Sequence, residues 1–342
     1  LHPLMQKKVK SVVIENDRKN EMHKSVKPAA NYESLSPDDL LNIIHEKGIV
    51  GMGGAMFPTY VKLKPKKRVD TLIVNGVECE PYLTADYRVM LERSKDIIDG
   101  IKIVAKILGV DKAIIAIEDN KKEAVGKFMD LAVELPTKYP QGAEKMLIKK
   151  VLGREVPPGG LPMDVGVVVS NVSTILAISD AVIKGIPLYK RVITVSGVTA
   201  PRPGNYEVKI GTPLQNIVNY CFSNYSSLFT VHCLLKMGGP MMGIPQADLS
   251  APVIKGTTGL VAVKKSEIEY TSARNCIKCG RCVDVCPMEL YPLYFAMYSS
   301  RDNLKELCNY NVKQCIECGC CEYICSSKIP LVGLAKKAKQ LC

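Results

Sequence analysis

Apolar runs that resemble strands alternate with amphipathic helical stretches from Gly51 to about Lys190. The expected strands are 71–74, 113–117 and 165–169, and the expected helices are 36–45, 94–108, 121–135 and the stretch up to 183. Strands that alternate with helices of this length are typical of β-α-β units. The pattern therefore predicts an α/β sandwich with a partly parallel sheet.

The segments on either side have a different pattern of predicted strands and helices from this region. Residues before it hold a single strand-like run, 9–15, which is too little for a domain. After Arg191, two short strands surround a Pro/Gly turn, a helix runs to about Cys221, and an exposed loop is expected at Asn224–Ser227. We divide the chain into 1–32, an α/β domain over 33–190, a strand-and-helix module over 191–262 and a cysteine-dense domain over 263–342.

The composition is that of a soluble globular protein, with 47% hydrophobic and 23% charged residues among 342. No run reaches the roughly 20 apolar residues that span a bilayer, and no secretory signal is visible. The chain begins at Leu1 rather than Met, so we expect a piece of a longer protein. The net charge of +12 would suit nucleic acid, an anionic membrane surface or acidic partners. Nucleic acid is disfavoured, because the basic residues are dispersed, no binding module occurs and Trp is absent.

Two cysteine quartets carry the strongest chemical signal. The first has the spacing C-x2-C-x2-C-x3-C-P and the second repeats it without the proline. This is the pattern of bacterial two-cluster ferredoxins, in which the fourth cysteine of each run ligates the other cluster. A zinc site is the alternative, but structural zinc usually draws its ligands from two separated pairs. The expected ligand sets are Cys276, Cys279, Cys282 and Cys325 for cluster one, and Cys315, Cys318, Cys321 and Cys286 for cluster two.

The other six cysteines are expected to be buried or incidental thiols rather than a disulfide framework. They are Cys79, Cys221, Cys233, Cys308, Cys320 and Cys342. Tight cysteine groups in a chain without a secretion signal indicate metal ligation in a reducing compartment.

Four polar turns form the second signal. The glycine-rich loop Gly51–Thr59 permits close approach of backbone N–H groups to a phosphate, although no strand leads into it as a dinucleotide fingerprint requires. Asn75–Pro81 and Ser170–Thr174 follow expected strands, where open α/β sheets bind ligands, and Tyr139–Lys145 is a further Gly/acid turn. The acids of these turns could also be simply solvated. Met237–Gly243 is expected to be a packed turn, with docking of the cysteine-dense domain as the alternative.

Together these turns resemble the flavin-binding, NADH-oxidising subunit of respiratory complex I. The string Gly-Val-Glu-Cys-Glu-Pro-Tyr-Leu-Thr-Ala-Asp-Tyr-Arg at 76–88, with the two quartets, resembles more specifically the C subunits of Rnf electron-transport complexes, over roughly 35–330. The resemblance implies a Rossmann-like FMN-binding α/β sandwich, a β-grasp (SLBB) module over 191–262 and a helical two-cluster ferredoxin domain. It also implies that 1–32 is the remnant of a barrel-sandwich domain whose last strand lies near 11–16.

Site residues follow from the same resemblance. It implies that FMN is bound by Gly51, Gly53, Gly54, Lys62, Asn75, Glu78, Cys79 and Gly142, with Asn171 and Thr174 on the phosphate side. It implies that Glu144, Glu80 and Phe57 face the nicotinamide nucleotide and serve catalysis. The sequence departs from complex I at Met56, which replaces a glycine, and at Ser170 and Ser173, which replace an Asn and a Glu.

The implied activity is electron exchange between NAD(H) and a low-potential ferredoxin through FMN and two [4Fe–4S] clusters, coupled to ion translocation by the whole complex. The implied partners are the membrane Rnf subunits, including a ferredoxin-like iron–sulfur subunit, and ferredoxin indirectly. The implied location is peripheral, at the cytoplasmic face of the bacterial membrane. Two alternatives are a related soluble reductase serving cobalamin or proline reductase, and an electron-wiring subunit with an empty flavin fold. The stretch Tyr82–Tyr87 favours the Rnf interpretation.

Overall fold

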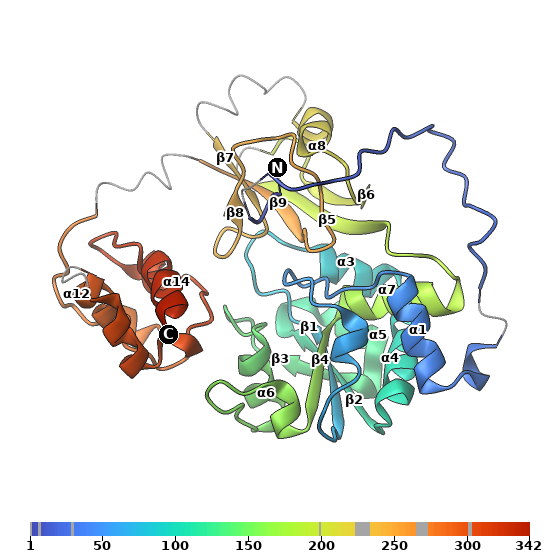
Figure 1. The fold of residues 1–342 in the computed structure, drawn as a ribbon, viewed down its shortest axis with the longest axis horizontal. Coiled ribbons are helices and arrows are strands. Elements are labelled where there is room, and N and C mark those ends of the chain that lie inside the picture. The colour runs from blue at the N-terminus through green and yellow to red at the C-terminus, as the bar shows by residue number, and fades with distance from the viewer. Residues whose placement is uncertain are drawn as a thin grey trace.

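The computed structural model describes residues 2–5, 8–28, 31–197, 200–222, 233–264, 273–299 and 303–342. They form two α/β units, each built on one sheet, and a small helical unit that ends the chain (Figure 1). In this described part, no helix is long and apolar enough to cross a membrane. The loop expected at 224–227 lies outside the described residues.

The first sheet has the strand order β3-β2-β1-β4 and is parallel throughout. Its strands are β1 (Thr71–Gly76), β2 (Lys112–Glu118), β3 (Ala132–Leu135) and β4 (Val167–Asn171), which confirms the three predicted strands. Successive side chains point to opposite faces. Leu72 and Val74 join one buried core, and Ile73 joins another on the opposite face. Helices therefore cover both sides of this sheet, as a parallel sheet requires.

Most of the helices lie on the first of these faces. They are α1 (Pro37–Glu46), α4 (Ser94–Leu108), α5 (Lys122–Phe128) and α7 (Val172–Ile183), while α6 (Glu144–Leu152) packs on the other face. The start of α1 follows from its sequence: the Ser36 hydroxyl accepts the Asp39 N–H, the Asp39 carboxylate accepts the Ser36 N–H, and Pro37 occupies the first turn. The predicted helices at 36–45 and 94–108 are confirmed.

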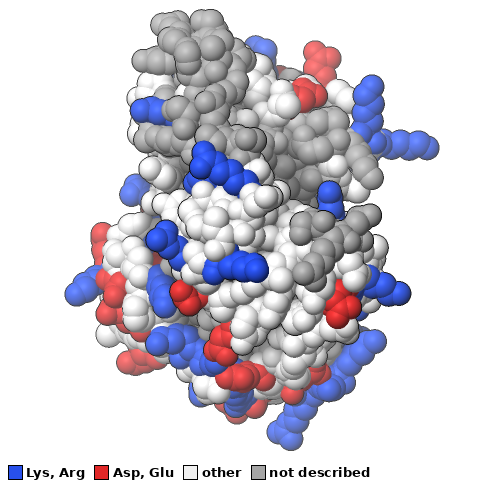
Figure 2. Space-filling view, turned by 90° about the vertical axis from the view of Figure 1, so that its left-hand side faces the viewer, with Lys and Arg blue, Asp and Glu red and all other residues white. Residues whose placement is uncertain are grey.

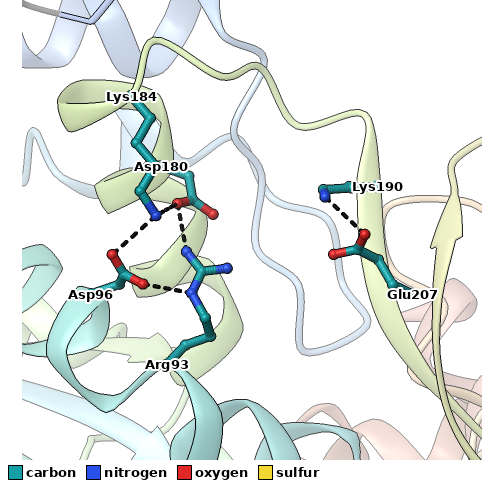
Figure 3. A network of polar contacts seen from close by, with 6 residues as sticks. All are labelled: Arg93, Asp96, Asp180, Lys184, Lys190 and Glu207. Carbon is teal, nitrogen blue, oxygen red and sulfur yellow. Dashed lines mark hydrogen bonds and ion pairs between the residues drawn. The ribbon is translucent and has the colours of Figure 1, made fainter. Parts of the chain in front are cut away.

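An ion-pair network fastens α4 to α7 (Figure 3). Arg93 lies 2.5 Å from Asp96 and 2.7 Å from Asp180, and Lys184 lies 3.0 Å and 2.8 Å from the same two carboxylates. Burial pushes the pKa of Asp96 upward, but hydrogen bonds from Arg93 and Lys184 hold it below its ordinary value. The helices approach closely beyond the network, where Gly100 of α4 is buried against the Ile175 carbonyl of α7.

Two predicted elements are wrong. Residues 9–15 form no strand, and Val13 is 91% exposed, because no strand of the described residues pairs with this segment. The helix expected over 121–135 ends at Phe128, where Met129 takes a φ of 41°. The chain then forms β3, whose Ala132 pairs with Ile115 of β2. Pairing with a strand distant in sequence overrides the local helical pattern.

The second sheet belongs to the middle of the chain. Its order is β6-β5-β9-β7-β8, with β5 and β9 parallel and the other neighbours antiparallel. The strands are β5 (Lys190–Gly197), β6 (Gly204–Lys209), β7 (Cys233–Met237), β8 (Ile244–Pro245) and β9 (Gly259–Lys264). Helix α8 (Leu214–Cys221) shares a buried core with them, which confirms the strand and helix predictions made for 192–221.

The helical unit contains the short helices α11 (Arg281–Asp284) and α13 (Cys320–Ile324), and the longer α12 (Leu293–Ser299) and α14 (Leu331–Leu341). Cys308 and Cys342 form a disulfide in it, so the prediction of free thiols is wrong for this pair. The end of α14 packs against the 3-10 turn Leu304–Tyr310 and brings the two cysteines together. Cys79, Cys221 and Cys320 are free thiols, as predicted, and Cys233 is buried.

Gly100→Ala should destabilise the first unit, because the new methyl group would overlap the Ile175 carbonyl oxygen. We expect a loss of about 1–3 kcal/mol in the free energy of unfolding, as for other overpacked cores. Gly126→Ala is the matched control: Gly126 is a glycine of α5 with open space where a Cβ would lie. That variant should be stabilised by about 0.5–1 kcal/mol. Equal effects of both substitutions in urea unfolding would contradict the close packing of α4 on α7.

Candidate functional site

The candidate site lies at the carboxyl ends of β1 and β4. From β1 the chain moves outward to β2 and β3, and it then crosses back to β4 on the other side of β1. Open α/β sheets bind ligands at such a switch point. The register pairs Asn75 of β1 with Asn171 of β4, so two of the predicted site residues occupy neighbouring positions at this edge.

The glycine-rich loop rests on the first turn of α7. A bridge between Val50 and Pro58 closes the loop at its base, and the Met52 N–H donates to Thr174 Oγ1 at 2.9 Å. A Cβ on Gly53 would lie 3.5 Å from the Asn171 side chain. Among the described residues, the N–H groups of Gly53 and Gly54 have no hydrogen-bond partner. Free N–H groups beside the positive end of a 12-residue helix fit a phosphate such as that of FMN.

The 139–145 turn folds directly over the end of β1. The Asn75 side chain donates to the Gly142 carbonyl at 2.9 Å and accepts the Val77 N–H at 3.0 Å. A Cβ on Gly142 would lie 2.6 Å from the Val77 carbonyl oxygen and 3.1 Å from Cys79 Sγ, so only glycine fits there. Burial raises the pKa of Cys79 to about 11, which keeps this thiol neutral and unreactive at physiological pH.

Lys62 and Glu144 join two further elements across the site. Lys62 ends the short helix α2 (Thr59–Lys62), Glu144 begins α6, and their charged atoms are 2.6 Å apart. The side chains are 36% and 39% exposed, so a ligand can reach both. Phe57, in the glycine-rich loop, is 51% exposed and offers an aromatic face to solvent.

Glu78 and Glu80 have fixed partners, so the interpretation as solvated acids is wrong. The Glu78 carboxylate accepts the N–H groups of Asp86 and Tyr87, in the first turn of α3 (Ala85–Glu92), at 3.0 and 3.1 Å. Burial, and then the charge of Asp86, raise the pKa of Glu78 to about 8. The Glu80 carboxylate accepts the N–H groups of Met241 and Met242, and burial raises the pKa of Glu80 as well. The two acids therefore anchor different segments.

Sequence reasoning missed two charged residues beneath the site. The Asp86 carboxylate accepts hydrogen bonds from Asn171 Nδ2, at 2.7 Å, and from the Ser173 hydroxyl. Arg191 is buried and donates to the carbonyls of Met52 and Lys255. Burial lowers the pKa of Arg191, and the charges of Asp86 and Glu78 oppose that fall. Asp86 lies within the string that carries the resemblance, whereas Arg191 at the start of a strand gave no local signal.

The eight quartet cysteines line two cavities in the helical unit. Each cavity takes three cysteines from one quartet and the fourth from the other: Cys315, Cys318, Cys321 and Cys286 line one, and Cys276, Cys279, Cys282 and Cys325 line the other. Within the described ranges, no three or more His, Cys, Asp or Glu side chains are grouped to hold a single metal ion. Thiolates spread around a cavity suit a group larger than one ion, such as a cubane cluster.

The two halves of this unit repeat the same local geometry. Gly280 and Gly319 both adopt positive φ, at 80° and 83°, at the starts of α11 and α13. The first sulfur of each quartet accepts a backbone N–H at 3.4 Å, from Lys278 and from Glu317. Such bonds to the ligand sulfur are one of the means by which proteins set cluster potentials.

Comparison with known proteins divides the chain along the same lines. Residues 44–180 match the family described as the Nuo51 FMN-binding domain, and residues 275–329 match the 4Fe-4S dicluster domain. The crystal structure of an NAD+-reducing [NiFe]-hydrogenase in the H2-reduced state shares the fold, with a TM-score of 0.56 and 19% sequence identity. The match covers 92% of this chain and 63% of that one.

Relatives with curated names are much more similar. The C subunit of the proton-translocating ferredoxin:NAD(+) oxidoreductase complex of Clostridium ljungdahlii is 47% identical over 87% of this chain. The C subunit of the Na(+)-translocating complex of Acetobacterium woodii is 43% identical over 89%, and that of the ion-translocating oxidoreductase complex of Rhodobacter capsulatus is 44% identical over 78%. The chain spans 66%, 70% and 52% of these relatives. It therefore belongs to the family of C subunits of ion-translocating ferredoxin:NAD(+) oxidoreductase complexes.

Proposed function

We propose that this chain exchanges electrons between NAD(H) and a low-potential carrier, through FMN at the β1–β4 edge and two [4Fe–4S] clusters in the helical unit. The observation that carries the proposal is the convergence of the four polar turns on one sheet edge, in a chain whose eight quartet cysteines line two cavities. The names of the relatives, which include ferredoxin and NAD, favour this function over a soluble cobalamin or proline-reductase partner.

A bound flavin supplies the conversion between the two-electron nicotinamide and the one-electron clusters. The chain's own residues bind and orient it. Gly53 and Gly54 offer free N–H groups, within the described part of the chain, to the phosphate, beside Asn171 and Thr174 at the start of α7. The other residues proposed to bind FMN are Gly51, Lys62, Asn75, Glu78, Cys79 and Gly142, of which Asn75 and Gly142 fix the turn that covers the sheet edge.

The nicotinamide side is assigned to Phe57 and Glu144, whose side chains are accessible. Phe57 can stack on a planar ring, and Glu144 can accept a hydrogen bond once it turns from Lys62. Glu80 would have to release the N–H groups of Met241 and Met242 to reach a ligand. We therefore assign it to holding that turn in place.

Glu144→Gln and Lys62→Ala should each lower NADH oxidation with FMN and an artificial acceptor about tenfold, or about 1.4 kcal/mol in the barrier. Their melting temperatures should change little, because a pair this exposed contributes at most about 1 kcal/mol to stability. Glu207→Gln is the control, since it breaks the comparably exposed Lys190–Glu207 pair of the second sheet (Figure 3). If both site variants keep the full rate, the site is misplaced.

For the clusters, we propose crossed ligation: cluster one by Cys276, Cys279, Cys282 and Cys325, and cluster two by Cys315, Cys318, Cys321 and Cys286. The cysteine content of the two cavities supports it. Cys286→Ser should then perturb the same low-temperature EPR signal as Cys318→Ser, and it should spare the signal lost in Cys279→Ser.

Cys320→Ser is the control for this experiment, because Cys320 adjoins a ligand but is not among the residues that line either cavity. It should leave both signals in place. Loss of one shared signal in Cys286→Ser and Cys279→Ser would mean that each quartet holds its own cluster.

The remaining domain assignments are also proposals. We propose that the second α/β unit is a β-grasp (SLBB) module, supported by its mixed five-stranded sheet and by helix α8 in its core. Its boundary moves from 262 to Lys264, where β9 ends. The FMN-binding domain is proposed to span 33–190, and the ferredoxin-type domain to occupy the cysteine-dense end. Because the strand expected near 11–16 is absent from this described segment, 1–32 receives no domain assignment.

We propose that the chain attaches to the cytoplasmic face of the bacterial membrane through other Rnf subunits, with a ferredoxin-like iron–sulfur subunit among them. On the side of the molecule where α12 and α14 lie, basic and acidic side chains of the described residues are interspersed (Figure 2). Such a surface favours a protein partner over nucleic acid or bare lipid. The chain should therefore sediment with membranes only when partner subunits are present. Strong binding to anionic vesicles at physiological salt would point to direct attachment instead.

A further inference from the structure

The turn between β7 and β8, residues 238–243, is an ordered structure that the proposed function leaves unused. We call it the Met241 turn. The Gly238 N–H donates to the Gly259 carbonyl at 2.8 Å, the Gly243 N–H donates to the Gly239 carbonyl at 2.9 Å, and Lys236 Nζ donates to the Pro240 carbonyl at 2.7 Å. A turn fixed by three such bonds has a defined shape and can hold a neighbouring segment in place.

One side of the Met241 turn is fastened to the first unit by Glu80, which follows β1. The Glu80 carboxylate accepts the Met242 N–H at 2.7 Å and the Met241 N–H at 3.1 Å. A Cβ on Gly239 would overlap this carboxylate, so the approach requires glycine. Hydrogen bonds to an ionised acceptor are the stronger kind, and two of them converge on one side chain here.

The other side of the Met241 turn faces the second cysteine quartet. A Cβ on Gly319 would lie 3.3 Å from the Met241 carbonyl oxygen. The adjacent residue, Cys318, accepts a hydrogen bond at its carbonyl from the Tyr139 hydroxyl, at 2.5 Å. Tyr139 belongs to the 139–145 turn, and Gly142 of the same turn packs against Val77 and Cys79. Two separate segments, the 139–145 turn over the end of β1 and the Met241 turn of the second sheet, therefore meet neighbouring residues of one cluster motif.

The first quartet has no such attachment. Within the described ranges, no hydrogen bond joins residues 276–286 to the two α/β units. A tyrosine hydroxyl ordinarily titrates at about pH 10, so it is protonated and able to donate at physiological pH. The contact is thus available over the whole physiological pH range.

We propose that Tyr139 and the Met241 turn are positioning elements that seat cluster two against the FMN site, so that cluster two exchanges electrons with the flavin before cluster one. The inference rests on the proposed function and adds the order of the clusters and the residues that set it. The hydride of NADH brings two electrons and each cluster takes one. One NADH therefore reduces both clusters, NAD+ leaves and one proton is released to water.

Tyr139→Phe tests this positioning of cluster two, because it removes only the hydroxyl that donates to the Cys318 carbonyl. After anaerobic mixing with NADH and rapid freezing, the EPR signal of cluster two should appear first in the wild-type holoprotein. In Tyr139→Phe the flavin should bleach at the unchanged rate, while the signal of cluster two appears about tenfold more slowly, because electron transfer slows as the separation of the two groups grows. Dithionite should still develop both signals fully. Tyr323→Phe, which alters a tyrosine that is 76% exposed in the same unit, should behave as wild type.

A glycine pair gives an independent test. Gly319→Ala and Gly280→Ala carry the same backbone strain, but only Gly319 abuts the Met241 turn, and Gly280 has open space around it. Hydrogen exchange should therefore accelerate over 316–322 and over the Met241 turn in Gly319→Ala and in Tyr139→Phe. In Gly280→Ala the Met241 turn should exchange as in the wild type.

The outcomes separate the two proposals. If NADH fails to bleach the flavin, the proposed function is overturned. Hydrogen exchange still tests whether Tyr139 and the Met241 turn hold the second cysteine quartet in place. If the flavin bleaches but cluster one is reduced first, the seating of cluster two is wrong. It is equally wrong if Tyr139→Phe matches Tyr323→Phe in both the EPR and the exchange experiments.

Discussion

The parallel pairing of β1 with β4 determines where every other part of the candidate site can lie. It places Asn75 beside Asn171 at the carboxyl edge of the sheet, where the chain reverses its order. The glycine-rich loop rests on α7, which continues β4, and the 139–145 turn rests on Asn75 of β1 and on the residues that follow it. A shift of one residue in the register between β1 and β4 would separate the glycine-rich loop from the 139–145 turn.

The half-buried carboxylates of Asp86 and Glu78 and the buried guanidinium of Arg191 hold this edge together. Asp86 binds Asn171 and Ser173, Glu78 binds the first turn of α3, and Arg191 reaches the glycine-rich loop from the second sheet. A hydrogen bond to a charged group contributes roughly 1.5–3 kcal/mol, and removing one partner leaves the other buried and unsatisfied. These charges therefore couple the two sheets, and the edge proposed to bind flavin owes its shape to residues from both.

The sequence predicted most strongly those features that depend on neighbours in the chain. The cysteine quartets, the strands β1, β2 and β4 and the capped start of α1 all follow from local spacing and periodicity. The errors arise where distant partners decide. The run 9–15 has strand residues but no described strand beside it, and the end of the helix expected at 121–135 pairs with β2 instead.

The same limit applies to the candidate site. The glycine loop and the asparagines at the ends of β1 and β4 could be named from their place after helices and strands. Arg191 could not, and neither could the role of the Tyr139 hydroxyl within the predicted 139–145 turn, since each depends on a contact more than 130 residues away in the sequence, with Met52 and with Cys318. The disulfide between Cys308 and Cys342 likewise depends on how α14 packs against the turn before it.

If these assignments are correct, one chain holds FMN and two cubane clusters, and NADH reduces them. The decisive measurement is the iron, sulfide and flavin content of the anaerobically purified protein, with its absorption spectrum before and after NADH. We expect about eight iron and eight sulfide per chain, about one FMN, and bleaching of the flavin band on addition of NADH. Stoichiometric zinc in place of iron, or bound flavin whose spectrum NADH leaves unchanged, would contradict them.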